Sequence, residues 1–378
     1  MNIKAKHWLG NIARLVIAIA NIVIAAGFVA SAWGGTVNPN ESVVWSILSL
    51  TFPAFLILML VALIVNLICF RKLAMFNIVV MLACISPILT YCPMNFFRPS
   101  EKSIAASGEK TLKLLTFNIL DLFVYGDHKP ETEGNPTMEY ILKSGADVVV
   151  MQEATDVLTP GFQGVSDGQH EELLDLYPYR DVTFRGMAIL SKYPFEKVDV
   201  DSRDPSQLDL CRYDLNVGDG EVVHVFNVHM QSIGLTAEDK EVYVQITEGE
   251  AADEADEIRH SLLSKLASAF RSRADQAEDI RQALDEVDGD VILAGDFNDI
   301  PGSSAYRTVA GSDMTDAYRE AGLGPAITYH ADRFYFRIDQ IFYRGGLDAL
   351  RVWRGDCSTS DHYPLLAIFK IEDKKTNN

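Results

Sequence analysis

The chain of 378 residues carries 33 lysines and arginines against 52 aspartates and glutamates, and its length predicts more than one domain. The acidic excess lies in residues 101–378, which hold 27 of the basic and 51 of the acidic residues, a net charge of −24. Proteins that hold long nucleic acids usually neutralise phosphates with lysine and arginine, so this balance disfavours that class of partner, although acidity also serves solubility alone.

The first hundred residues contain three long apolar stretches without charged side chains, at about residues 15–33, 44–70 and 73–95. Each is about long enough to cross a hydrocarbon core, which takes roughly 20 residues of helix. A cleaved signal peptide is the alternative for the first stretch, but it leaves the other two unexplained. The sequence therefore predicts a membrane anchor over residues 1–97 with three transmembrane helices.

The basic residues of the anchor predict its orientation. They precede the first span and occupy the turn between the second and third spans, whereas the loop at 34–42 has none; they are Lys4, Lys6, Arg14, Arg71 and Lys72. Because basic residues favour the cytoplasmic side, the N-terminus is expected in the cytoplasm. The domain after the third span is then extracytoplasmic, in the periplasm or at the cell surface.

Beyond the anchor, residues 98–110 are small and polar and predict a linker, residues 111–371 a catalytic domain, and residues 372–378 a disordered tail. Seven apolar runs in the domain predict strands, several of them buried on both faces: Leu112–Ile119, Val148–Met151, Met187–Leu190, Val222–Met230, Val291–Ala294, Ile338–Tyr343 and Leu365–Phe369. Helices are predicted at Met138–Lys143 and Glu171–Leu176, and an apolar stripe predicts a long one within Ala252–Val287.

Two cysteines, Cys211 and Cys357, fall in the outer domain. They are too few for a fold built on disulfides. A single bridge between them is compatible with an oxidising compartment, and their spacing leaves open whether they pair.

The run Val291–Ala294 ends in Gly295-Asp296-Phe297-Asn298. Asp296 and Asn298 are two residues apart, so on extended backbone their side chains point the same way. A carboxylate there can accept a proton from water while an amide fixes a phosphate oxygen. Capping of a turn by Asp and Asn is the alternative interpretation of this string.

Five further polar motifs also lie at strand ends. They are Asn118 after its strand, Glu153 after Val148–Gln152, the pair Asn227 and His229, Asp339 at the start of a strand, and Asp361-His362 before the last strand. Mg²⁺ prefers carboxylates together with water and substrate oxygens, so Glu153 suits a metal ligand. Each motif alone also has an ordinary explanation, such as a turn residue, a helix cap or a buried core histidine. Their joint order is what indicates a single site.

This order of motifs resembles the endonuclease/exonuclease/phosphatase superfamily, which spans type I deoxyribonucleases, abasic-site endonucleases, inositol polyphosphate 5-phosphatases and neutral sphingomyelinases. The resemblance covers about residues 112–370 and excludes the membrane segment. It implies a four-layer α/β sandwich, in which two packed mixed sheets are flanked by helices and the active site lies along one edge of the sheets.

The resemblance also implies roles for individual residues. Glu153 is similar to the main Mg²⁺ ligand of the family, with Mn²⁺ as the alternative ion, and Asn118 and Asp361 are further candidate ligands. Asp296 resembles the base that activates water, whereas Asn118, Asn227 and Asn298 are candidates for binding the phosphate. His229 and His362 would flank the scissile phosphate, and Asp339 would fix the tautomer of His362.

One position departs from the pattern. Some nucleases of the family carry a second acid two residues after the first asparagine, and here that position is Leu120. Asp121 follows it and would face the other way on a strand. A site of the DNA-repair type is therefore disfavoured.

Together these features predict a membrane-anchored, extracytoplasmic, Mg²⁺-dependent phosphoesterase in which water activated by Asp296 attacks a phosphodiester or phosphomonoester in line. A small or lipid phosphoester is favoured as the substrate, and no obligate protein partner is evident. The alternative is a surface nuclease that degrades external DNA or RNA, for which the candidate groove arginines are Arg180, Arg185, Arg203 and Arg212. A catalytically inactive binding or scaffold protein is the third hypothesis.

Overall fold

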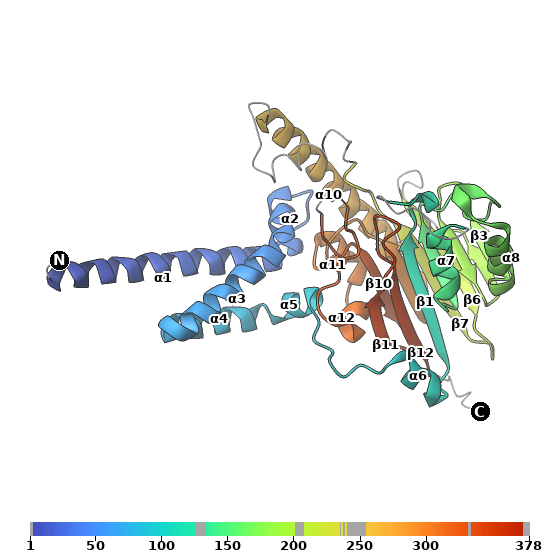
Figure 1. Cartoon of the computed structure of the whole chain (residues 1–378), viewed down its shortest axis with the longest axis horizontal. Coiled ribbons are helices and arrows are strands. Elements are labelled where there is room, and N and C mark those ends of the chain that lie inside the picture. The colour runs from blue at the N-terminus through green and yellow to red at the C-terminus, as the bar shows by residue number, and fades with distance from the viewer. Residues whose placement is uncertain are drawn as a thin grey trace.

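The computed structural model describes residues 3–125, 134–200, 208–234, 236, 239, 255–331 and 334–372. Within them, a bundle of apolar helices at the N-terminal end is followed by an α/β domain, and the two lie one after the other along the longest axis (Figure 1). Of the predicted tail at 372–378, all but Glu372 lies outside the described residues.

The α/β domain contains two six-stranded sheets. In order across the first sheet, the strands are β11 (Leu347–Arg354), β12 (Leu365–Ile371), β1 (Thr111–Asn118), β2 (Val148–Gln152), β4 (Ala188–Ser191) and β3 (Tyr179–Val182). Across the second they are β5 (Phe195–Val198), β6 (Asp209–Asn216), β7 (Val222–His229), β8 (Asp290–Asp296), β10 (Asp339–Arg344) and β9 (Thr315–Asp316). Each sheet has one parallel pair among these strands, β1 with β2 and β7 with β8.

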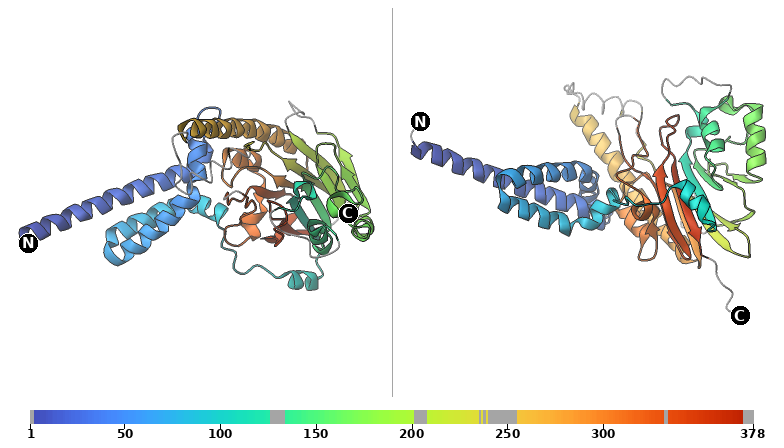
Figure 2. Two further views of the ribbon diagram at one scale, coloured as in Figure 1. Left: turned by 45° about the horizontal axis from the view of Figure 1, so that its top comes forward. Right: turned by 60° about the horizontal axis from the view of Figure 1, so that its bottom comes forward.

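Helices cover the outer face of each sheet. Those against the first sheet are α7 (Pro136–Lys143) and α8 (Asp167–Leu176), and those against the second are α10 (Ala255–Asp285) and α11 (Ser304–Ala310). Leu114 of β1 belongs to the core between the two sheets, whereas its neighbour Leu115 packs in the cluster that contains α7 and α8. Both faces of β1 are thus apolar because both are covered. The predicted four-layer α/β sandwich is confirmed (Figure 2).

Shorter elements complete the domain. They are α6 (Glu101–Ser107), which lies within the predicted linker, α12 (Ala317–Ala321), and two short 3₁₀ turns at Leu120–Leu122 and Phe162–Gly164. All seven predicted strands are present, whereas β3, β5, β6, β9 and β11 had no prediction. Cys211 and Cys357 are both free thiols, so the two do not pair.

The strand register gathers the predicted site residues at one edge. His229, the last residue of β7, lies opposite Asp296, the last residue of β8. Asp339, the first residue of the antiparallel β10, also pairs with Asp296. In the first sheet Asn118 pairs with Gln152, directly before Glu153. Parallel strands that end together therefore bring side chains from both sheets to the same edge.

Gly295 allows β8 to reach this edge. Its φ is +152°, and a Cβ atom there would lie 1.9 Å from the carbonyl oxygen of Val228 on β7. Only glycine fits so close to the neighbouring backbone. The glycine of the Gly-Asp-x-Asn string thus has a packing role beside the chemistry of Asp296.

The N-terminal bundle consists of α1 (Ile3–Trp33), α2 (Val43–Leu50), α3 (Phe52–Cys69), α4 (Arg71–Ala83) and α5 (Ile85–Tyr91), with a short 3₁₀ turn at Gly34–Thr36. Two helical segments, Asn11–Thr36 and Phe52–Cys69, are long and apolar enough to cross a membrane. The pair α4 and α5, bent by 68°, makes a third if it is one span. The stretch predicted as one span at 44–70 is divided, because the helix breaks at Thr51 and Pro53 lies in the first turn of α3.

Three asparagines, one from each of α1, α3 and α4, lie buried inside the bundle. The Nδ2 group of Asn66 donates to Oδ1 of Asn21 at 2.8 Å, and Nδ2 of Asn21 donates to Oδ1 of Asn77 at the same distance. Polar side chains between membrane helices are stabilised by such mutual hydrogen bonds. We call Asn21, Asn66 and Asn77 the asparagine triad.

The bundle is docked on the α/β domain by close backbone contact. A Cβ atom at Gly35 would lie 1.9 Å from the carbonyl oxygen of Gly302. Nearby, Nδ2 of Asn40 donates to Oδ1 of Asp275 at 2.8 Å. The buried Arg337 reaches from the domain to the carbonyl oxygen of Thr90 at 2.8 Å. These contacts fix the position of the bundle beside the edge at which β7 and β8 end.

Candidate active site

Asp296 is at the centre of the side chains gathered at the sheet edge. Its Oδ1 accepts a hydrogen bond from the backbone N–H of Asn298 at 2.8 Å, and its Oδ2 accepts one from Nδ2 of Asn118 at 3.2 Å. The Nε2 atoms of His229 and His362 each lie 3.6 Å from the same Oδ2. Burial raises the pKa of the Asp296 carboxyl, although His362 opposes the rise. A carboxylate with a raised pKa is a stronger base.

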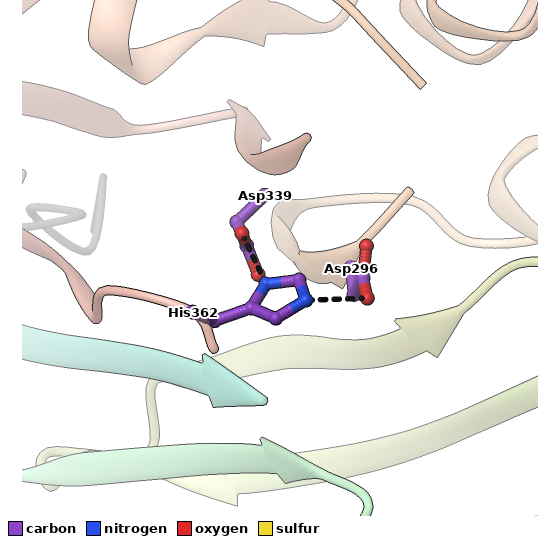
Figure 3. A group of neighbouring side chains, drawn as sticks. All are labelled: Asp296, Asp339 and His362. Carbon is purple, nitrogen blue, oxygen red and sulfur yellow. Dashed lines mark hydrogen bonds and ion pairs between the residues drawn. The ribbon is translucent and has the colours of Figure 1, made fainter. Parts of the chain in front are cut away.

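His362 lies between two carboxylates, as Figure 3 shows. Its Nδ1 is 2.9 Å from Oδ2 of Asp339, and its Nε2 faces Asp296. Burial by itself would lower the pKa of His362, but the Asp339 and Asp296 carboxylates outweigh it and raise that pKa to about 10. The ring is therefore an imidazolium near neutral pH, with Nδ1–H donating to Asp339.

Glu153 follows β2 in a turn with unusual backbone geometry. Its φ is +48°, in the left-handed region, which costs a residue other than glycine about 1–3 kcal/mol. Its Oε1 accepts from Nδ2 of Asn118 at 3.0 Å and lies 3.9 Å from Nε2 of His229. The side chain is 38 % exposed, so one carboxylate of the cluster is open to the solvent side.

Asn118 and Asn298 both hold Asp296 in place. The amide of Asn118 bridges Glu153 and Asp296, while its Oδ1 accepts from the backbone N–H of Leu120 at 3.2 Å. Nδ2 of Asn298 donates to the carbonyl oxygen of Met230 at 2.9 Å and lies 3.3 Å from Oδ2 of Asp296. Asn298 also has a left-handed backbone, with φ at +50°.

Asp361 lines the same cavity as Glu153 and Asp296. The hydroxyl of Ser360 donates to the carbonyl oxygen of Asn118 at 2.8 Å and lies 3.2 Å from Oδ1 of Asp361. The loop before β12 is thereby attached to the end of β1, which brings Asp361 and His362 to the site.

Asn227 has a different environment from the other predicted site residues. It is fully buried, its Nδ2 donates to the carbonyl oxygens of Met151 and Ala188, and its Oδ1 accepts from Nε2 of Gln152 at 2.6 Å. Both ends of the amide join the two sheets. Asn227 thus lies beneath the site, two residues deeper in β7 than His229.

Three supporting residues had no predicted role. The hydroxyl of Thr328 accepts from the backbone N–H of Asp339 at 3.1 Å. Arg273 and Asp299 form a buried ion pair at 3.3 Å beside the cavity. An arginine next to the apolar stripe of α10 was the one signal in the sequence for that pair, because a charge on a buried face requires a partner.

The side chain of Asp121 contributes to a turn beside Glu153. It lies in the turn after β1 rather than on a strand, and its Oδ1 accepts from the backbone N–H of Thr155 at 2.9 Å. It therefore stabilises the turn that carries Glu153.

A cavity of about 460 Å³ opens over the cluster. Its polar wall contains Glu153, Asp296, Asn298, Asp361 and His362. The remaining wall is mostly apolar and includes Leu50, the last residue of α2. The cavity thus touches both the α/β domain and the helical bundle.

The donor atoms of the cluster fit a hard divalent ion. Such ions take carboxylate oxygens, and Glu153 and Asp361 offer them on the open side of the cavity. The donor atoms of Asp296, Asp339 and His362 also lie within 4.8 Å of one another. In that trio, however, Nδ1 of His362 already binds Asp339, so Glu153 is the better candidate.

Comparison with known proteins adds to this geometry. Residues 115–362 match the model of the endonuclease/exonuclease/phosphatase family, and residues 14–91 match that of a domain of unknown function. No curated protein sequence matches the chain.

Three solved structures illustrate the structural similarity. An endonuclease/exonuclease/phosphatase from Beutenbergia cavernae is 21 % identical, with 69 % of this chain and 72 % of that one covered and a TM-score of 0.46. The human Nocturnin catalytic domain is 16 % identical, with 69 % and 95 % covered and a TM-score of 0.48. Sphingomyelinase C from Streptomyces griseocarneus is 22 % identical, with 68 % and 99 % covered and a TM-score of 0.40.

Proposed function

The chain belongs to the endonuclease/exonuclease/phosphatase family, and on that premise we propose that it is a membrane-anchored, extracytoplasmic, Mg²⁺-dependent phosphoesterase acting on a small or lipid phosphoester. Members of the family are metal-dependent phosphoester hydrolases. The observation that carries the proposal is the position of His362 between the carboxylates of Asp339 and Asp296, beside the open carboxylate of Glu153.

Asp296 is the proposed general base. It accepts a proton from water as the water oxygen bonds to phosphorus and the ester P–O bond opposite breaks. Asn118 and the backbone of Asn298 hold the carboxylate in position for this transfer. A well-placed base of this kind contributes roughly 10²–10⁴ in rate.

The two histidines stabilise the negative charge that grows on the phosphoryl oxygens. His362 does so as an imidazolium, held in orientation by Asp339, and His229 approaches from the end of β7. Glu153, with Asp361 as a second ligand, would hold the Mg²⁺ ion, for which Mn²⁺ is the alternative. When bound there, the ion supplies Lewis-acid stabilisation of a phosphate oxygen and of the leaving group.

The proposed orientation in the membrane is supported by the layout of the bundle. In Figure 1 the N-terminus and the turn between α3 and α4 lie at the end of the bundle away from the α/β domain. That turn contains Arg71 and Lys72, and Arg14 lies on the N-terminal part of α1. Basic residues at this end favour its cytoplasmic placement, with the catalytic domain on the other side.

The arginines expected of a nuclease groove have other partners. Arg212 forms two hydrogen bonds at 2.8 Å to Asp214, and Arg185 is paired with Asp209. Arg180 donates to the carbonyl oxygens of Leu174 and Tyr177. The fourth candidate, Arg203, lies outside the described residues. These pairings favour a small or lipid substrate over a long polyanion.

The test uses the full chain purified in detergent. It is incubated with Mg²⁺ and bis-p-nitrophenyl phosphate, p-nitrophenyl phosphate, sphingomyelin, phosphoinositides or plasmid DNA. We expect hydrolysis of at least one non-nucleic ester, its loss in EDTA, and its return with Mg²⁺ or Mn²⁺. Turnover that is indifferent to EDTA, or cleavage of DNA ahead of every other substrate, would contradict the proposal. Proteolysis of a C-terminal tag in intact cells tests the orientation.

A further inference from the structure

The cavity over the active site has two walls of opposite character. Glu153, Asp296 and His362 belong to its polar wall. The other wall is built from aliphatic and aromatic side chains of four separate segments: Leu50, Ile233, Leu266, Phe270, Phe334 and Phe336. A ligand that fills this cavity therefore meets charged side chains at one end and hydrocarbon at the other.

The apolar wall includes no free cation that could bind a second phosphate. Among the residues that line the cavity in the described part of the chain, Arg273 is the sole lysine or arginine. It is 1 % exposed, pairs with Asp299 at 3.3 Å and donates to the carbonyl oxygen of Gln231 at 3.0 Å. Its guanidinium also lies over the ring of Phe270, 4.9 Å from the centroid. Its charge is thus already compensated inside the protein.

The apolar wall is continuous with the membrane part of the chain. Leu50 ends α2, and Phe52 begins the span α3. On α2, Val44 and Trp45 are 63 % and 40 % exposed, and tryptophan is typical of the membrane–water interface. α2 also contacts α10, which contributes Leu266 and Phe270. α2 therefore adjoins both the membrane span α3 and the apolar wall of the cavity.

We infer that the cavity binds the hydrocarbon chain of a membrane phosphoester and that the membrane domain, through Leu50, forms part of the substrate site. The inference rests on the proposed function, since the phosphate of that lipid is placed at Glu153 and Asp296. The N-terminal domain then does more than anchor the enzyme. It contributes to the choice of substrate.

The first test is a series of alkyl p-nitrophenyl phosphodiesters, from ethyl to octyl, each kept below its micelle concentration. The full chain is held in lipid nanodiscs with Mg²⁺. Each buried methylene contributes about 0.8 kcal/mol, so kcat/KM is expected to rise roughly two- to fourfold per methylene until the cavity is filled. Equal kcat/KM for ethyl and octyl esters would overturn the inference and leave the proposed function intact.

Substitutions then test where the hydrocarbon chain of the substrate lies. Leu50→Gln and Leu266→Gln are expected to flatten the dependence of kcat/KM on chain length. Leu263→Gln on α10 is the matched control, because Leu263 is exposed and lies outside the cavity lining. A length dependence that survives Leu50→Gln would remove the membrane domain from the site.

A binding measurement separates this inference from the question of activity. Dodecylphosphonate and ethylphosphonate are titrated calorimetrically into the full chain with EDTA present. We expect the dodecyl compound to bind at least tenfold more tightly, and Leu50→Gln and Leu266→Gln to reduce that ratio. An equal affinity for the two phosphonates would overturn the inference, whereas inactivity toward every ester would overturn the proposed function alone.

Discussion

The helical bundle and the α/β domain place their apolar side chains in opposite ways. Leu15 on α1 and Ile68 on α3 are 61 % and 80 % exposed, whereas Leu114 and Ile292 in the α/β core are fully buried. In the bundle the polar asparagine triad is inside. The removal of hydrocarbon from water accounts for both arrangements, because the surface of the bundle is suited to lipid and that of the α/β domain to water.

The two regions also differ in whether their buried polar groups are fully hydrogen-bonded. The asparagine triad is joined by hydrogen bonds among its own members. At the sheet edge Oδ1 of the buried Asp339 has no hydrogen-bond partner, and Glu153 is open to the cavity. A network in which the polar groups are hydrogen-bonded to one another stabilises helix packing. A network with an unpaired polar atom can still bind a group of the substrate. Substitutions should therefore affect stability in the first region and turnover in the second.

The largest expected effect is that of Asp296→Asn. It removes the proposed base without changing the shape of the side chain, so kcat should fall by about 10²–10⁴. Burial disfavours the charged form of Asp296, and Asp339 still faces the His362 ring, so the thermal midpoint should fall less than in Asp339→Asn. Steady-state kinetics and a thermal melt measure the two quantities, and Asp219→Asn, at an exposed acid, is the control. Near-full turnover in Asp296→Asn would remove this site from consideration.

Asp339→Asn should produce a pH-dependent loss of stability. Burial lowers the pKa of His362, but the nearby carboxylates raise it to about 10, above its ordinary value of about 6.5. A raised folded pKa gives stabilisation that is complete below about pH 6.5 and is lost as the pH rises through about 10.

The measurement is the thermal midpoint of the wild type and of Asp339→Asn in EDTA between pH 6 and 10.5. The difference between the two midpoints should be widest below pH 6.5. There, removal of one partner of a buried ion pair lowers the free energy of unfolding by about 3–5 kcal/mol. The difference should narrow toward pH 10. A difference that is constant over this range would show that the carboxylate does not hold a charged ring.

Gly35→Ala tests the contact between the two regions. Its new Cβ would meet the carbonyl oxygen of Gly302, and overpacking of this kind costs about 1–3 kcal/mol. Hydrogen exchange of the amides in α11 should become faster while the strands of both sheets keep their protection. Gly168→Ala is the control, because a Cβ there has open space around it. Equal exchange in the two variants would mean that the contact does not hold the regions together.

The smallest expected effect is that of Asn21→Ala in the asparagine triad. It leaves Asn66 and Asn77 without their shared partner and should cost about 0.6–2 kcal/mol, with catalysis unchanged. The midpoint of unfolding in a titration with SDS measures the loss. Asn11→Ala, at an exposed asparagine of the same helix, is the control. An identical midpoint for both variants would assign the triad no role in stability.

The predicted strands were those whose residues are apolar on both faces, and this explains which strands were missed. β8 is buried throughout and was visible as a run of apolar residues. β6 alternates with period two, with Cys211, Tyr213 and Leu215 on one face and charged residues on the other, so it is not a run of apolar residues. In β11 the charged Asp348 and a register shift between Ala349 and Arg351 interrupt the pattern. Similarly, the break between α2 and α3 lies within one uncharged stretch, where Pro53 was a weak boundary signal because proline is tolerated inside membrane helices.

The site illustrates a second limit of sequence patterns. The alternation of side chains along a strand predicts the face on which a side chain lies. It does not predict how far that side chain is from the end of the strand. Asn227 and His229 do share a face of β7, yet one joins the two sheets and the other reaches the edge. The convergence of Glu153, Asp296 and His362 was predictable because each follows or precedes a buried strand. Their hydrogen-bond partners depend on tertiary register.

The contact at Gly35 has a consequence for how such an enzyme meets its substrate. Because there is no room for a methyl group between the two backbones, the α/β domain that carries the cavity is seated directly on the helical bundle. For a substrate that resides in the bilayer, the search then takes place in two dimensions. Turnover would follow the mole fraction of that lipid in the surrounding leaflet rather than its amount per volume of solution.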